Sequence, residues 1–229
     1  MRSKILRRVM LILPIAIFSV TFLLSLLRLT VGYGFFGPIV MFQSAVGVIA
    51  VIIPRLLHRG FGLAVPLPLL TVYTVFILGT VLFGEIFEGY YLLAVWDDLM
   101  HGVGGFLLFS LGLSVSGGFN VRGGGVSCFR LAFALCFALF TGVTWEVVEF
   151  FSDGVFGTNM QKFMAMGADG ALYPLIGRAA VTDTMVDLIV DTLGAVAGVL
   201  PAAFIPGVRD RLLSWLTVYP AKGAKMGDF

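Results

Sequence analysis

The sequence contains little charge. Only 12% of its 229 residues are Asp, Glu, Lys or Arg, against about 25% in typical soluble domains, and 59% are hydrophobic. A soluble globule needs more polar surface than this composition provides. The formal net charge of +2 is also too small to indicate nucleic-acid binding. The composition therefore predicts an integral membrane protein with membrane lipid as its surroundings and no nucleic-acid partner.

The sequence is also poor in residues that carry familiar chemistry. Its two cysteines, Cys128 and Cys136, have neither the spacing of a zinc motif nor that of a disulfide framework, and are expected to be packing residues. The glycine-rich residues 120–125 follow no strand pattern and precede no Gly-Lys-Ser/Thr, which favours a flexible turn over a phosphate-binding loop. The sequence also has no serine elbow. If the protein is an enzyme, a metal must therefore carry the chemistry.

Long apolar runs dominate the chain and predict an all-α, polytopic transmembrane helical bundle that forms a single integral membrane domain over residues 1–229. The basic amino terminus resembles a signal peptide, but its apolar part exceeds the ~7–15 residues of a signal sequence and no small-x-small cleavage site follows, so we interpret it as a retained span. Six spans are expected, at about 9–29, 36–57, 61–84, 97–117, 129–151 and 181–205. A polar loop precedes the sixth span, and an interfacial tail is expected at 208–219.

Basic residues in short loops predict the orientation. With the amino terminus in the cytoplasm and six spans, 12 of the 15 basic residues fall on the cytoplasmic side, whereas 11 of the 13 acids fall outside or in the outer halves of spans. The cytoplasmic basic residues are Arg2, Lys4, Arg7, Arg8, Arg55, Arg59, Arg122, Arg130, Arg209, Arg211, Lys222 and Lys225. Both termini are therefore expected to be cytoplasmic.

A polar stretch at residues 96–105 opens the fourth span with two carboxylates and one of only two histidines in the chain. Asp97 and His101 are four positions apart, and Asp98 and His101 are three apart. On a helix, either acid therefore shares a face with the imidazole.

The predicted topology brings further acids to the same depth. The fifth span runs outward and carries Glu146 and Glu149 near its end, and the sixth runs inward and carries Asp183, Asp187 and Asp191 near its start. Glu146 and Glu149 are three apart and Asp187 and Asp191 four apart, so each pair can project from one side of its helix. Asp191 is expected to be the deepest acid.

Converging acids in a membrane span require neutralisation. An ionisable side chain in a span costs roughly 2.5–3.5 kcal/mol on insertion scales, and neighbouring carboxylates repel one another. Bound divalent metal, shared protons or basic partners are the alternatives, and the nearby basic residues are only Arg28, Lys162 and Arg178. One imidazole among carboxylates suits Mg, Mn, Ca, Fe or Zn, and we expect a divalent metal ion of undetermined identity and number.

The simpler alternative is that the acids at span ends are solvated in the lipid headgroup region and have no function. That interpretation fits Asp98, Glu85, Glu88, Asp153 and Asp169. It fits Glu146, Asp187 and Asp191 less well, because they lie further within apolar runs. His101 could equally be a hydrogen-bonded structural histidine. The glycines at 102, 104, 105, 194 and 198 are expected to permit close helix packing.

Four motifs resemble those of the YjdF-type bacterial inner-membrane proteins and, more distantly, the VanZ-like group. They are Trp-Asp-x-x-x-His-x-x-x-Gly-Phe at 96–106, Trp-Glu-x-x-Glu at 145–149, Phe-Gly-Thr at 156–158, and Asp-Thr-x-x-Asp followed by Gly-Ala at 183–195. The resemblance implies a multi-pass protein of the inner cell membrane with one shared site. Carried over by position, it indicates Asp97, His101, Glu146, Glu149, Asp183 and Asp187. Asp98 and Asp191 fall outside the shared pattern.

Our first hypothesis is an outward-facing, metal-dependent site that hydrolyses or transfers groups on a lipid or cell-envelope substrate. Asp97, His101, Glu149 and Asp187 would hold the metal, and Glu146 or Asp183 would act as general base on bound water.

Two alternatives stay open. The first is a cation or proton transporter that uses the same carboxylates, although spans four to six offer no acid below Asp191 to continue a path. The second is a non-catalytic membrane protein of envelope assembly, in which the acids only hold helices together.

Overall fold

The computed structural model describes residues 2–32, 37–93, 95–116, 128–204 and 214–220. Within these ranges the chain is overwhelmingly α-helical, and it divides into two compact units. Unit 1 comprises residues 1–100 and 209–229, and unit 2 comprises residues 101–208. The predicted all-α, polytopic fold is confirmed.

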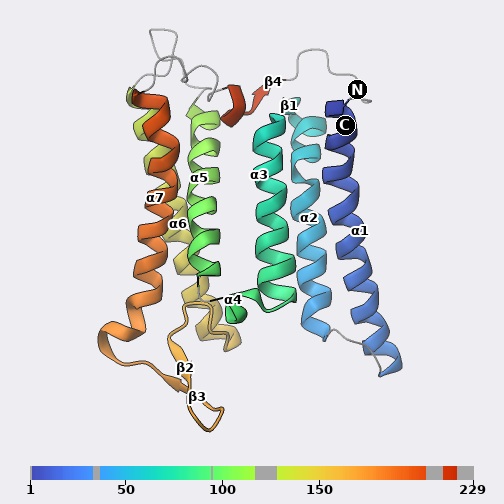
Figure 1. The fold of residues 1–229 in the computed structure, drawn as a ribbon, viewed down its shortest axis with the longest axis vertical. Coiled ribbons are helices and arrows are strands. Elements are labelled where there is room, and N and C mark those ends of the chain that lie inside the picture. The colour runs from blue at the N-terminus through green and yellow to red at the C-terminus, as the bar shows by residue number, and fades with distance from the viewer. Residues whose placement is uncertain (1, 33–36, 94, 117–127, 205–213, 221–229) are drawn as a thin grey trace. The chain divides into compact units, whose positions relative to one another are not determined.

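Unit 1 is built on three long helical segments (Figure 1). These are α1 (Arg2–Val31), α2 (Pro38–Phe61) and α3 (Leu67–Ile77), and α3 continues as a π-helix, η1 (Leu78–Ile86). The short α4 (Gly89–Leu92) follows. The core between α1 and α2 forms where Phe18, fully buried, packs against Gly47. A side chain at position 47 would occupy the space of the Phe18 ring, so this glycine permits the two helices to approach.

One end of unit 1 gathers segments that are distant in the sequence. Gly62 ends α2 in the left-handed conformation, with φ of 62°. The next residues form β1 (Leu63–Ala64), which pairs antiparallel with β4 (Tyr219–Pro220). Arg7 Nη1, near the start of α1, donates to Val65 O at 2.9 Å. The first turns of α1 and strand β4 thereby lie at the same end of unit 1, and the cytoplasmic location of that end stays a prediction.

The third helix differs in detail from the span expected at 61–84. It begins at Leu67, because Gly62 has ended α2 and Pro66 starts a new helix with extended backbone. It then widens into the π-helix at Leu78. Trp96 Nε1 donates to Gly79 O at 3.1 Å within this π-helix, so an aromatic side chain bonds to a backbone carbonyl of the widened turns.

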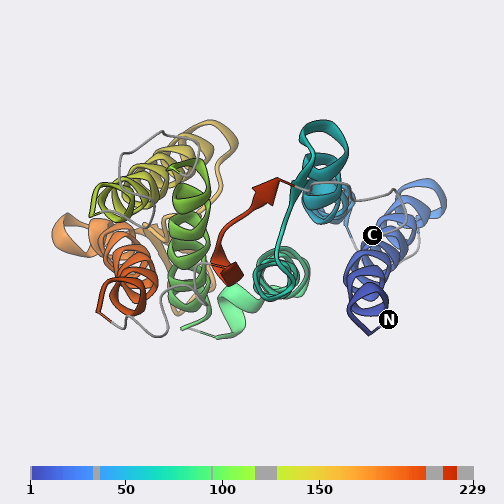
Figure 2. The ribbon, with the colours of Figure 1, turned by 90° about the horizontal axis from the view of Figure 1, so that it is seen from above.

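Unit 2 is a three-helix bundle. Its helices are α5 (Trp96–Ser116), whose first turn lies before the division, α6 (Cys128–Phe156) and α7 (Thr182–Phe204), and they run alternately up and down (Figures 1 and 2). Glycines set the spacing: a Cβ added at Gly194 would overlap the Gly102 carbonyl, and one added at Gly105 would overlap the backbone of Asp191. The expectation that these glycines serve close packing is confirmed.

The segment expected to be a polar loop is largely ordered. Helix α6 extends to Phe156, and a β-hairpin follows, formed by β2 (Met164–Met166) and β3 (Leu172–Pro174). A 3₁₀ turn, η2 (Gly177–Val181), then leads into α7. Figure 1 shows the hairpin beyond the end of α6.

Five helices in the described part of the chain are long and apolar enough to cross a membrane. They are Ser3–Val31, Pro38–Phe61, Leu67–Ile86, Trp96–Ser116 and Cys128–Phe156. Helix α7 forms where the sixth span is expected but is not among the five, and Asp183, Asp187 and Asp191 lower the hydropathy of its first turns. Six spans therefore stay a prediction.

Some expectations fall outside the described residues. The glycine-rich turn at 120–125 does so, as do residues 208–213 of the interfacial tail and the basic residues Arg122, Arg209, Arg211, Lys222 and Lys225.

Candidate metal centre

The carboxylates of unit 2 gather at one end of its bundle. Helix α6 ends, and α7 begins, at the end from which the hairpin projects, and α5 enters the bundle from the same end (Figure 1). The late residues of α6 and the early residues of α5 and α7 therefore lie at a common level, as the sequence predicts.

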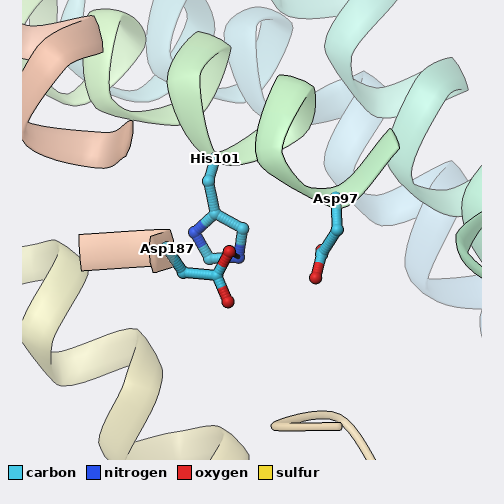
Figure 3. A group of neighbouring side chains, drawn as sticks. All are labelled: Asp97, His101 and Asp187. Carbon is cyan, nitrogen blue, oxygen red and sulfur yellow. Dashed lines mark ion pairs between the residues drawn. The ribbon is translucent and has the colours of Figure 1, made fainter. Parts of the chain in front are cut away.

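His101 on α5 lies between two aspartates of α7. Its Nε2 is 3.9 Å from Asp187 Oδ1 and its Nδ1 is 3.5 Å from Asp191 Oδ1. Figure 3 shows Asp187 directed toward the imidazole. All three residues are buried, with Asp187 only 1% exposed. Asp187 and Asp191 are one turn apart on α7, so both face the helix that carries His101.

The close contact of α5 with α7 produces this arrangement. Gly102 follows His101 directly and faces Gly194, while Gly105 faces the backbone of Asp191. Because these contacts involve backbone atoms, they bring the helices closer than side chains would allow. The glycines thus place the imidazole within reach of the α7 carboxylates.

Helix α6 supplies a second side of the cluster. Ligand atoms of His101, Glu146 and Glu149 all lie within 4.8 Å of one another, and both glutamates are buried. They are one turn apart, as predicted for residues that share a helix face.

Glu146 is a deeply buried carboxylate of the cluster. It is 4% exposed, and neither of its carboxylate oxygens has a hydrogen-bond partner among the described residues. Gln161, whose Nε2 donates to Thr184 Oγ1 at 2.9 Å, lies near this carboxylate together with Thr184. Neither reaches hydrogen-bond geometry to the Glu146 oxygens. A buried carboxylate without such a partner is costly unless a cation or a proton neutralises it.

Asp97 joins His101 from one turn earlier on α5. Ligand atoms of Asp97, His101 and Asp187 lie within 4.8 Å of one another (Figure 3). The continuous helix from Trp96 to Ser116 fixes Asp97 relative to His101. His101 therefore belongs to both clusters, the one with Asp97 and Asp187 and the one with Glu146 and Glu149.

One of these separations suits a shared cation. Ligand atoms about 2.1 Å from a metal in tetrahedral geometry lie about 3.4 Å from one another. The 3.9 Å from His101 Nε2 to Asp187 Oδ1 is near this value, whereas the 3.5 Å to Asp191 Oδ1 starts from Nδ1, the other ring nitrogen, which faces away from an ion bound at Nε2. Carboxylates with one imidazole form a hard ligand set.

Of the residues predicted for the site, Asp183 lies in a different setting. Its Oδ1 is 3.2 Å from Lys162 Nζ, an ion pair of partly buried side chains. Asp183 belongs to neither cluster around His101 within the described residues, and neither does Asp98. Asp191, which falls outside the sequence motifs, is instead adjacent to the imidazole.

Sequence reasoning missed the role of Asp153. Its carboxylate accepts hydrogen bonds from Thr158 Oγ1 at 2.6 Å, Met160 N at 2.7 Å and Gln161 N at 3.0 Å. It thereby folds the segment after α6 back over the helix end and places Gln161 beside the cluster. The spacing was a usable signal, because Asp153 continues the helix face of Glu146 and Glu149 by one further turn.

The hairpin contains one further titratable pair. Tyr173 Oη donates to Asp169 Oδ2 at 2.7 Å, and Ala171 N donates to Asp169 Oδ1 at 3.1 Å. Both bonds lower the pKa of Asp169, and the bond from Tyr173 has the larger effect. The Asp169 carboxylate in turn raises the pKa of Tyr173.

Comparison with known proteins identifies the family. A family model described as "Predicted membrane protein (DUF2238)" matches residues 10–206, which is most of the chain. The chain belongs to this family. The match includes all of the carboxylates around His101. No curated protein and no solved structure matches the chain. Membership shows an integral membrane protein, and the chemistry has to be argued from the site.

Proposed function

We propose that unit 2 binds a divalent cation through His101, Glu146 and Glu149. The observation that carries this proposal is the Glu146 carboxylate, which is buried and has no hydrogen-bond partner for either oxygen among the described residues. Its ligand atom lies within 4.8 Å of those of His101 and Glu149, so one ion could contact all three. A cation there would offset both the burial of this charge and its repulsion from the neighbouring carboxylates.

Asp97 and Asp187 complete the proposed centre. They share His101 with the glutamates and lie close enough to it to act as further ligands or to accept a proton. A divalent cation lowers the pKa of a bound water molecule, and a nearby carboxylate can then act as general base. Asp183, the other base suggested by the sequence, would instead position the start of α7 through its ion pair with Lys162.

The reaction that we propose is metal-dependent hydrolysis or group transfer on a lipid or cell-envelope substrate. Support comes from the location of the cluster near one end of the bundle, the end predicted to face outward. The resemblance to YjdF-type proteins favours the bacterial inner membrane as its location. Both the reaction class and this location are part of the proposal.

Metal content of the purified protein tests the centre. Protein in mild detergent is dialysed against Mn²⁺ or Zn²⁺, washed, and analysed by inductively coupled plasma mass spectrometry, with thermal unfolding measured in parallel. At a free metal concentration of 100 times Kd, binding would stabilise the protein by about 2.7 kcal/mol. Glu146→Gln removes a ligand charge but keeps the side-chain volume, and Asp98→Asn on α5 is the control outside the cluster.

The expected result is stoichiometric metal in the wild type and in Asp98→Asn, with most of it lost in Glu146→Gln. Equal metal content and equal thermal shifts in Glu146→Gln and the wild type would refute the site.

One observation favours transport as a second candidate. The His101 imidazole lies within 4 Å of both Asp187 and Asp191, which follow each other by one turn along α7. Ionisable groups in such a series can relay protons or cations along a helix. In vesicles, transport predicts ion flux that Asp187→Asn abolishes, whereas an enzyme without transport predicts no flux in the wild type.

A further inference from the structure

Unit 1 contains a cleft at the end where β1 and β4 pair, far along the sequence from the carboxylates of unit 2. Arg7 of α1, Arg55 of α2 and the first turns of α3 border it, and it is shallow and partly open to the surroundings. Apart from Thr74, apolar side chains line the rest of its wall, among them Met10, Leu11, Val51 and Leu70. The cleft is thus amphipathic, because guanidinium groups border it together with apolar side chains.

The two arginines differ in the hydrogen bonds that their guanidinium groups make. Arg7 Nη1 donates to Val65 O, which fixes this side chain at the rim. Arg55 is partly buried, yet it makes no hydrogen bond or ion pair within the described residues. Beside an apolar wall, a guanidinium without a counter-charge is unfavourable, and an anion would offset that cost.

The position of the cleft indicates the source of the anion. Arg7 is five residues after the start of α1, about 8 Å along its axis. Arg55 is six residues before the end of α2. Both helices are membrane-span candidates, so the guanidinium groups lie near the level of lipid headgroups and the apolar wall extends toward the acyl chains.

We propose that this cleft binds an anionic phospholipid. The phosphate would lie between Arg7 and Arg55, and one acyl chain would lie along Met10, Leu11, Val51 and Leu70. Basic pockets between membrane helices recognise anionic headgroups in this way. A zwitterionic lipid fits less well, because its ammonium group would lie close to two guanidinium groups.

The test compares lipids on the full chain in detergent. Native mass spectrometry and thermal unfolding are measured with phosphatidylglycerol or phosphatidylcholine at equal concentration, and with inorganic phosphate at the same concentration. The variants are Arg55→Gln, which removes the charge, Arg55→Lys, which keeps it, and Arg59→Gln, which removes a basic residue that does not line the cleft.

The wild type and Arg59→Gln are expected to bind phosphatidylglycerol in preference to phosphatidylcholine. Arg55→Gln should lose about five-fold in that preference, the effect of one basic residue near an anionic headgroup, and Arg55→Lys should keep most of it. Equal binding of the two lipids by the wild type would overturn the proposal without any variant. So would an unchanged preference in Arg55→Gln, or equal stabilisation by inorganic phosphate, which would indicate a site for free anions.

Discussion

Gly194→Ala tests how backbone contact between helices forms the candidate centre. Gly194 on α7 faces Gly102 on α5, and an added Cβ would overlap the Gly102 carbonyl. The obstructing atoms belong to the backbone, so no flexible side chain can move aside. The substitution must therefore separate α5 from α7.

The expected magnitude follows from two opposing effects. Carbon and other heavy atoms reach favourable contact at about 3.5 Å or more, so relief of this overlap requires the helices to separate by about 1 Å or more. Overpacking of this kind costs about 1–3 kcal/mol. Replacing a helical glycine by alanine gains up to about 1 kcal/mol in helix propensity. The net expectation is a loss of about 1–2 kcal/mol in the free energy of unfolding.

The same displacement should weaken the candidate metal centre. His101 precedes Gly102 directly, and its Nε2 lies 3.9 Å from Oδ1 of Asp187, a further ligand proposed for the centre, across the α5 and α7 contact. Widening that distance by about 1 Å would prevent Asp187 and the imidazole from contacting the same ion. Gly194→Ala should thus lose both stability and bound metal.

Thermal and denaturant unfolding in mild detergent, followed by tryptophan emission, measures the change. The matched control is Gly154→Ala on α6, because an added Cβ there meets nothing within 4 Å. The control should be neutral or stabilised by up to about 1 kcal/mol. If Gly194→Ala were as stable as Gly154→Ala and kept its metal, the backbone contact would not set the geometry of the centre.

Two further predictions concern the segment after α6. Asp153→Ala removes the acceptor of three hydrogen bonds, so we expect faster amide exchange at residues 158–161 and a loss of about 2–4 kcal/mol in unfolding free energy; unchanged exchange would argue against this role. Tyr173→Phe should raise the pKa of Asp169 toward its ordinary value of 3.8, which carboxylate NMR signals measure. Because folding lowers this pKa, the contact stabilises the hairpin above pH 3.8 and is lost as pH falls through the lowered value; an unmoved pKa in the variant would show that the tyrosine is not its cause.

The sequence by itself determined that the chain is a helical membrane protein and which of its residues share a helix face. Apolar runs of span length lead to membrane helices whatever their neighbours, because the hydrophobic effect acts on each run separately. Spacing of three or four residues placed Glu146 with Glu149, and Asp187 with Asp191, since helical periodicity is a local property. The third helix begins at Leu67 because Gly62 ends α2 and Pro66 precedes the new helix. The length of the apolar run alone did not reveal this starting point.

Only the tertiary structure decided which carboxylates meet the imidazole. Periodicity gives the face of a helix but not its rotation toward a neighbour, and that rotation depends on contacts between positions distant in the sequence. Here the pairing of Gly102 with Gly194 turns Asp187 and Asp191 toward His101, while Asp183 pairs with Lys162. The return of the segment after α6 onto Asp153 is equally a tertiary contact, because its hydrogen bonds form only once the chain has reversed direction over the helix end.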